Sequence, residues 1–313
     1  MYAGLRRCPQ ITHLALSQAG VLTRAQLARA GITQAYVDSQ VEAERWTPWA
    51  RDVMLLQNAA PNRRQLMWIA LLDAAIPSAL ASHTSLQMCG FRAFAAEAES
   101  IHIVVPRGNK CADLPGVKVH ESRRFDERHI TVYRGFPCTE RARSAIDAAA
   151  WQPWPRFAIT VLAAAVQQRV CTVSHLEEAL AKVGRVRHKR HMRLALRDIA
   201  GGAESLGEID MAALCRRFGL QPPDRQRSRR DPSGRRRYLD CEWHLDDGAV
   251  VVLEIDGTHH LDVEHWTADM KRERKVVISR RWVLRAAASE VRLEGAALMA
   301  DLAAMGVPRL VRT

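Results

Sequence analysis

The residues best suited to chemistry lie near the C-terminus, in two segments that read as paired strands. Asp240 belongs to YLDCEWHL and Glu254 to AVVVLEI, with Asp246, Asp247 and Gly248 between them. A three-residue loop with Gly248 in the left-handed conformation is a common hairpin connection, and it places Asp240 directly opposite Glu254. Such neighbours have Cβ atoms about 4.5–5.5 Å apart, which suits two carboxylates sharing a divalent metal. A loop one residue longer or shorter would separate them onto opposite faces.

The second of these strands is apolar on both faces and then ends in acids. AVVVLEI predicts a strand in a sheet covered on both sides, yet Glu254 and Asp256 close it. Buried carboxylates are costly without a compensating cation, so acids at this position indicate a site. The alternative is two exposed acids paired with nearby arginines.

Further candidate groups flank the acidic strands. Glu204 lies four residues before Glu208 on a predicted short helix, so the two share a face. His260, beside His259, has the chemistry of a general base, a metal ligand or a phosphate donor, although an exposed pair without a role is the alternative. Arg272 lies in a basic helix that either stabilises phosphate charge or only covers the sheet.

An arginine-rich run precedes the first acidic strand. Residues 225–237 hold seven arginines and the single acid Asp231, with Pro232 and Gly234 inside the run and Pro222 and Pro223 just before it. We expect an exposed loop that contacts phosphates, or otherwise a solvated loop. The candidate DNA contacts in it are Arg227, Arg229, Arg230, Arg235, Arg236 and Arg237.

The first 60 residues have the spacing of a winged helix. The pattern predicts a helix over 11–19, a second over 24–30 capped by Thr23, a third capped by Thr33 that runs to about Ala43, and two short strands around Pro48. The third helix of such a fold enters the major groove. We therefore expect Gln34, Tyr36, Val37 and Gln40 to face bases and Thr23, Arg24 and Arg51 to lie near phosphates. A helical cap that binds protein, or nothing, is the alternative.

The middle of the chain alternates helical and strand patterns. Residues 63–76 and 82–90 read as helices, 101–105 and 117–120 as strands, and a helix from Thr139 ends near WQPWP at 151–155. Two scaffold helices are expected over 156–183 and 191–199. The predicted domains are 1–60, 61–155, a helical connector at 156–198, and 199–313.

Composition narrows the class of partner. The net charge is +12 and the pI about 9.9, which favours polyanions such as DNA. Seven scattered cysteines, none in a C-x-x-C pair, indicate reduced, mostly buried thiols rather than disulfides or structural zinc. We expect a cytoplasmic protein, because no segment reads as a membrane span or a secretory signal.

Residues 10–150 resemble the AbiEi family of antitoxins and its actinobacterial relatives. The resemblance rests on VLTRAQLARAGIT, WTPWARDVMLL, ALASHTSLQMCGF and GFPCTERARSAIDAAA. It implies a winged helix joined to a mixed α/β domain, and autoregulatory DNA binding. Family members commonly have a glycine where this chain has Asp52.

Residues 199–300 resemble the restriction-endonuclease-like domains related to the very-short-patch mismatch repair endonuclease, within the PD-(D/E)XK superfamily. The matching residues are Glu204 with Ser205, Asp240, the string Glu254, Asp256, Gly257 and His260, then Asp269, Arg272 and Arg285. The resemblance implies that Asp240 and Glu254 are metal ligands and Glu204 an accessory acid. The superfamily lysine two residues after the second acid is Asp256 here, and His260 is the expected substitute.

The expected fold class is therefore an α+β multidomain protein: an N-terminal winged helix with a mixed α/β domain, then a restriction-endonuclease-like α/β/α domain with a mixed central sheet. The leading hypothesis is a DNA endonuclease that uses Mg²⁺ or Mn²⁺, and the second is a regulator with a non-catalytic nuclease fold. A third makes residues 199–313 a toxin restrained by the N-terminal half. DNA is the expected partner and a homodimer one permitted assembly. No membrane and no small organic cofactor are expected.

Overall fold

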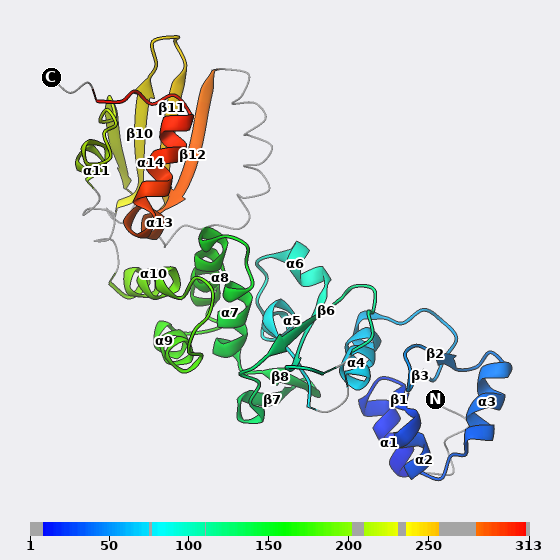
Figure 1. The fold of residues 1–313 in the computed structure, drawn as a ribbon. Helices are drawn as coiled ribbons and strands as arrows, with labels where there is room; N and C mark the ends of the chain where they lie inside the picture. Colours follow the sequence, from blue (N-terminus) through cyan, green and yellow to red (C-terminus); the bar gives the residue numbers. More distant parts are fainter. Residues whose placement is uncertain are drawn as a thin grey trace. The chain divides into compact units, whose positions relative to one another are not determined.

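The protein is described by a computed structural model that covers residues 9–74, 77–109, 111–201, 210–230, 236–256 and 280–310. The chain forms two compact units, an N-terminal unit (Met1–Phe91 with Ala95–Ser144) and a C-terminal unit (Arg92–Phe94 with Ala145–Thr313). The described strands form three sheets (Figure 1). The fold is a multidomain mixture of helices and sheets, as the sequence predicts.

The N-terminal unit begins with the element order of a winged helix. Its small antiparallel sheet has the strand order β1-β3-β2. The elements are α1 (Pro9–Ser17), β1 (Val21–Thr23), α2 (Arg24–Arg29), α3 (Gln34–Glu42), β2 (Thr47–Pro48) and β3 (Val53–Leu55). The predicted helices are confirmed to within two residues.

Side-chain caps fix where the two short helices begin. The Thr23 hydroxyl accepts from the backbone N–H of Gln26, whose side chain returns a bond to the Thr23 N–H. The Thr33 hydroxyl accepts from the backbone N–H of Tyr36 and so caps α3, and a side-chain cap of this kind stabilises its helix by about 1 kcal/mol. Asp52, in the turn between β2 and β3, does not adopt a positive φ. The turn therefore does not require the glycine that members of the AbiEi family commonly have at this position.

The winged-helix sheet is buried on both faces. Leu22 and Met54 point into a core with α1, α2 and α3. Val21, Val53 and Leu55 point the other way, into a core shared with α4 (Arg63–Asp73) and the middle sheet. The predicted boundary at residue 60 therefore divides two elements that bury one another.

The middle sheet completes the N-terminal unit. Its five strands have the order β6-β5-β4-β8-β7. The elements are β4 (Ala79–Leu80), α5 (Ser82–Met88), α6 (Ala95–Glu99), β5 (Ile101–Pro106), β6 (Val117–Ser122), β7 (Ile130–Tyr133), β8 (Phe136–Thr139) and α7 (Arg141–Ala150). The prediction of β5, β6 and α5 is confirmed, whereas β4, α6 and the β7–β8 hairpin were not predicted.

Three histidines of this sheet region lie together, two of them buried and His120 half-buried. His83 and His102 are 2% and 5% exposed, and His102 stacks on His120. The His102 Nε2 lies 3.0 Å from the Glu97 carbonyl oxygen. Because a carbonyl oxygen can only accept, the Nε2 of His102 carries the proton. The Nδ1 of a neutral His102 then accepts from the His120 Nε2–H, also at 3.0 Å. Burial lowers the pKa of His83 and of His120 to about 3, so the cluster is neutral at physiological pH.

The C-terminal unit begins within α7, and three helices follow where two were predicted. They are α8 (Pro155–Gln167), α9 (Val173–Lys182) and α10 (Lys189–Gly201). The expected single helix over 156–183 is wrong, because Arg169 adopts φ +57° and Thr172 caps a new helix.

The last sheet of the chain is mixed. Its strands have the order β12-β11-β10-β9, antiparallel from β9 to β11 and parallel between β11 and β12. The elements are α11 (Met211–Arg217), β9 (Arg225–Arg230), β10 (Arg236–His244), β11 (Val250–Asp256), β12 (Arg281–Ala287), α13 (Ala288–Leu293) and α14 (Gly295–Ala304). The predicted mixed central sheet is confirmed.

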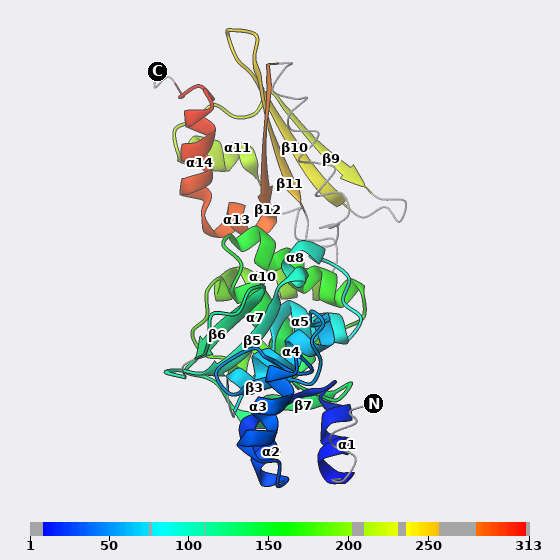
Figure 2. The ribbon, with the colours of Figure 1, turned by 90° about the vertical axis from the view of Figure 1, so that its right-hand side faces the viewer.

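One face of this sheet packs against helices. Cys241, Trp243, Val251 and Leu253 join residues of α11, α13 and α14 in one core. Figure 2 shows α11 and α14 on the same side of the sheet. Helices α11, α13 and α14 thus cover one face of this sheet.

The helical connector is part of this same unit. Ile159 of α8 and Ala195 of α10 pack against Ala287 at the end of β12, and Arg292 of α13 forms an ion pair with Asp198 of α10 at 3.2 Å. The predicted boundary at residue 198 therefore cuts through a packed core.

The cysteine side chains and the lengths of the helices bear on two expectations for the chain. The six cysteines within the described residues are all free thiols, and four of them are buried. None of the helices that the structure describes is long and apolar enough to cross a membrane.

Candidate metal and nucleic-acid site

The β10–β11 hairpin has the predicted register. Leu245 and Ala249 close the loop with a 2.8 Å backbone bond, Gly248 adopts φ +79°, and the Asp247 carboxylate accepts from the Ala249 N–H at 3.0 Å. The ladder then pairs His244 with Val250 and continues to Tyr238 with Asp256. Asp240 consequently lies directly opposite Glu254.

Four charged residues form one row across the four strands. Arg227 of β9 pairs with Asp240, Asp240 with Glu254, and Glu254 with Arg285 of β12. Their neighbours along each strand, such as Cys241 and Leu253, point into the core, so the row lies on the opposite face. We call Arg227, Asp240, Glu254 and Arg285 the charged row.

The charged row is neutral overall and has its acids in the centre. The Arg285 Nε donates to the Glu254 Oε2 at 2.8 Å, with 18% of the Arg285 side chain and 35% of the Glu254 side chain exposed. Arg227 is exposed and Asp240 half-buried. Two facing carboxylates repel each other, and a flanking arginine on each side reduces that repulsion.

A second ion pair lies one step along the same face. Arg281 of β12 contacts Glu242 of β10 at 2.8 Å. Glu242 pairs with the apolar Val252 rather than with another acid. Glu242 therefore offers one carboxylate where Asp240 and Glu254 offer two.

The donors of the charged row fit a hard divalent cation. Mg²⁺ and Mn²⁺ prefer oxygen ligands, and Mg²⁺ commonly takes only one or two protein carboxylates while water and substrate phosphate supply the rest. Asp240 and Glu254 provide such a pair. Among the described residues there is no group of three or more His, Cys, Asp or Glu side chains placed to hold a metal, so the fit rests on two carboxylates.

Other predicted catalytic residues have no described side chain. Asp256 is the last residue of β11, and its backbone pairs with Tyr238 and Ala287. Glu204, His260 and Arg272 lie outside the described residues. Arg285 is the group that the sequence analysis did not place in the site. Arg285 is among the residues that carry the resemblance, but its place beside Glu254 depends on the parallel pairing of β11 with β12, which are far apart in the sequence.

The arginine-rich run is a strand pair where a loop was predicted. Residues 225–230 form β9 and pair with β10, so the loop prediction is wrong over these positions. Alternating arginines and polar residues tolerate an edge strand, since neither face of it needs to be apolar. Strands β9 and β10 include Arg229, Arg230, Arg236 and Arg237, whose side chains the structure does not describe. Arg235 lies outside the described residues.

The winged helix presents fewer base-facing groups than predicted. Val37 is 2% and Gln40 8% exposed, so neither can reach a base. Tyr36 is half-buried and packs edge-to-face on Trp46. The predictions for Val37 and Gln40 are wrong because the inner face of α3 is needed for the core around Leu27 and Trp46, whereas the prediction for Tyr36 stays a prediction.

The remaining candidates of the winged helix lie beside acids. Gln34 donates to Asp38 at 2.6 Å, and Arg24 lies 3.8 Å from the same carboxylate. Glu42 is the other exposed charge of α3, which has no basic residue. Arg51 is exposed and Thr23 is used as a cap. The outer face of α3 thus carries exposed acids and no basic residue.

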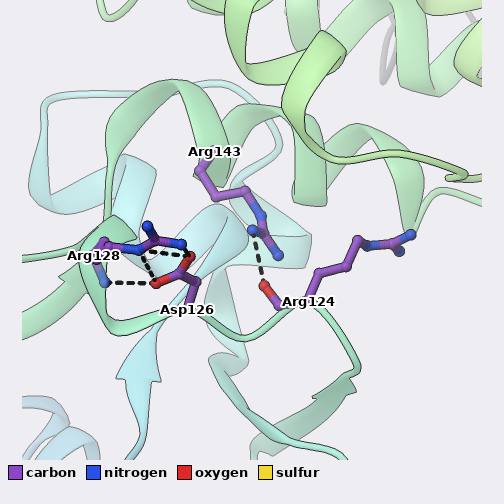
Figure 3. A network of polar contacts seen from close by, with 4 residues as sticks. All are labelled: Arg124, Asp126, Arg128 and Arg143. Carbon is purple, nitrogen blue, oxygen red and sulfur yellow. Dashed lines mark hydrogen bonds and ion pairs between the residues drawn. The ribbon is translucent and has the colours of Figure 1, made fainter.

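A separate arginine cluster lies after β6. Figure 3 shows Arg128 holding Asp126 with its Nε and Nη2, the shortest contact being 2.7 Å, and Arg143 donating to the Arg124 carbonyl at 3.4 Å. The hydrogen bonds from Arg128 lower the pKa of Asp126 to about 2. Arg128 and Arg143 are thus engaged in holding the connection between β6 and β7.

Comparisons with known proteins give little beyond this geometry. No protein-family model matches the chain, and no curated protein matches it. Among solved structures, the crystal structure of the Rv2827c protein from Mycobacterium tuberculosis is similar at 15% identity, covering 60% of this chain and 74% of that chain with a TM-score of 0.39.

Proposed function

We propose that the chain is a DNA-binding, metal-dependent endonuclease that hydrolyses phosphodiester bonds in the cytoplasm, in defence or DNA repair. The observation that carries the proposal is the direct pairing of Asp240 with Glu254 on the face of the sheet opposite its helical core. The proposed cofactor is Mg²⁺ or Mn²⁺, with no small organic cofactor.

Each residue of the charged row has its own role in this proposal. Asp240 and Glu254 would hold the cation, which when bound lowers the pKa of a coordinated water and offsets charge on the phosphate. Arg285 keeps the Glu254 carboxylate oriented through the 2.8 Å contact. Arg227, exposed at the β9 end of the row, is available to a phosphate oxygen, which guanidinium groups bind with charge-assisted hydrogen bonds.

The test is a nicking assay on supercoiled plasmid with Mg²⁺ or Mn²⁺. Asp240→Asn and Glu254→Gln keep the side-chain shapes but remove the charges, so the rate should fall roughly 100-fold or more, the equivalent of several kcal/mol. Glu242→Gln is the matched control, because it removes a carboxylate from the same face that has no acid opposite it. Equal nicking by the wild type and Asp240→Asn would contradict the proposal.

A second candidate function is a regulator whose nuclease fold is a non-catalytic platform. The Glu254–Arg285 ion pair favours it, because the guanidinium already occupies part of the place where a cation would bind.

Calorimetry of Mn²⁺ binding separates the two candidates. If the protein is an endonuclease, the wild type should bind Mn²⁺ and Glu254→Gln should lose that binding. If the nuclease fold is a non-catalytic platform, the wild type should bind no Mn²⁺. Arg285→Gln should then gain Mn²⁺ binding, because it leaves the charge of the two carboxylates less compensated. Arg281→Gln, which breaks the other ion pair on this face, controls for loss of one positive charge.

A further inference from the structure

Helix α10 carries a row of exposed arginines along one side. Arg190, Arg193 and Arg197 are all exposed, and their spacing of three and four residues places them on one helical face. We call these three residues the arginine stripe. Seven residues of helix rise about 10 Å, so the stripe presents three guanidinium groups over that length.

The other side of α10 is buried and holds the acid of the helix. Met192, Ala195 and Leu196 are fully buried. Asp198 is the single acid between residues 184 and 201, and its side chain is 9% exposed and paired with Arg292. The charge of the stripe is therefore not neutralised from within its own helix.

Among the described residues, the neighbouring elements form no ion pair with the stripe. Glu294 contacts His191 at 3.0 Å on the α13 side. Glu177 and Glu178 of α9 are exposed, yet no ion pair joins them to the stripe within the described part of the chain. Arg187, which is exposed, precedes the helix and extends the positive surface.

From this surface we propose that the arginine stripe binds the phosphate backbone of DNA and is a contact site separate from the charged row. The inference rests on the proposed function, since it assigns the DNA of that function a second point of contact. Every exposed cation from 185 to 197 is arginine, whose planar group binds phosphate oxygens in pairs. DNA offers an uninterrupted line of such charges, whereas an acidic protein offers scattered carboxylates.

The stripe and the charged row belong to one compact unit. Ala195 and Ile199 of α10 pack with Ala287, two residues after Arg285 on β12. DNA held by the stripe is therefore held by the same compact unit that carries Asp240 and Glu254. This makes α10 a positioning element for the substrate and not a catalytic one.

The test measures binding of a fluorescein-labelled DNA duplex of mixed sequence by anisotropy, in EDTA and over a series of salt concentrations. The triple variant R190Q/R193Q/R197Q should bind roughly tenfold more weakly and lose about 2 to 3 from the slope of log affinity against log salt. The control R169Q/R216Q/R217Q removes the same charge from exposed arginines elsewhere in the C-terminal unit. Gln preserves helix propensity, and thermal melting checks that both variants fold.

The outcomes separate the two proposals. Weaker binding by the stripe variant alone supports the inference. Equal loss in both triple variants overturns it, because overall charge would then explain the effect. Unchanged DNA binding by the stripe variant also overturns it and leaves the surface to an acidic protein. A wild type that binds no DNA defeats the proposed function itself, whereas binding without nicking defeats only its catalytic part.

Discussion

Individual side chains in this protein show how burial sets charge. In the N-terminal unit, His83, His102 and His120 are kept neutral by the core around them, and burial is the first cause of each lowered pKa. In the charged row, by contrast, Glu254 keeps a charged partner at 2.8 Å. Burial thus keeps the three histidines unprotonated, whereas the charged row holds an ion pair between Glu254 and Arg285.

The histidine cluster predicts acid lability of the N-terminal unit. Folded pKa values near 3 for His83 and His120 lie below the unfolded value of 6.5, so the unfolded state binds more protons between those limits. Stability is therefore full above pH 6.5 and falls as the pH drops toward 3, by up to about 1.4 kcal/mol per pH unit for each histidine.

Calorimetric unfolding over this pH range measures the effect. His83→Gln should reduce the pH dependence of the N-terminal transition, because it removes one of the groups that must stay unprotonated. His175→Gln, at an exposed position of α9, is the control and should leave that transition unaltered. An unchanged slope in His83→Gln would show that the cluster does not govern the acid response.

At the scale of elements, the β10–β11 hairpin determines whether the two acids meet. Its loop depends on Gly248, which adopts φ +79° with open space around its α-carbon. Gly248→Val should therefore destabilise the C-terminal unit by about 1–2 kcal/mol through backbone strain alone. Gly248→Asn should cost less than half of that, since asparagine tolerates this conformation. Urea unfolding compares the two, and equal losses would refute the role of the backbone angle.

The same hairpin shows what local sequence can predict. Loop length and alternation sufficed for the register of Asp240 with Glu254, and caps such as Thr23 sufficed for helix starts, because these depend on neighbours in the chain. Arg285 could not be placed, since parallel pairing depends on a crossover. Gln40 was misplaced because burial of α3 depends on Trp46 and α1, which no local pattern reports.

The loop prediction for the arginine-rich run was wrong for a different reason. Its composition predicts a loop, yet β10 offers a free edge that residues 225–230 complete. Backbone hydrogen bonding to an existing strand outweighed the weak preference of arginine for extended structure. Tertiary context decided the element.

On the scale of the whole molecule, the C-terminal unit extends well before residue 199. The C-terminal unit includes α8 to α10, so a fragment of residues 199–313 lacks the helices that cover Ala287 and the partners of Arg292 and Glu294.

We therefore expect a fragment of residues 141–313 to fold and the fragment 199–313 to lose several kcal/mol of stability or to unfold. Circular dichroism melting of both purified fragments measures this. Comparable melting temperatures would show that α10 is dispensable to the sheet. The same comparison must precede any toxicity test of residues 199–313, because an unfolded fragment would be harmless for trivial reasons.

The position of β9 at the end of the described sheet order has a consequence for self-association. An edge strand with unpaired backbone groups invites a second copy to add its own edge and begin a polymer. Here two such edges would bring Arg225 and Arg227 of each copy, both exposed, against their counterparts. Like charges opposed across strands are destabilising, so the residues proposed to attract DNA would also keep the chains from aggregating through this edge.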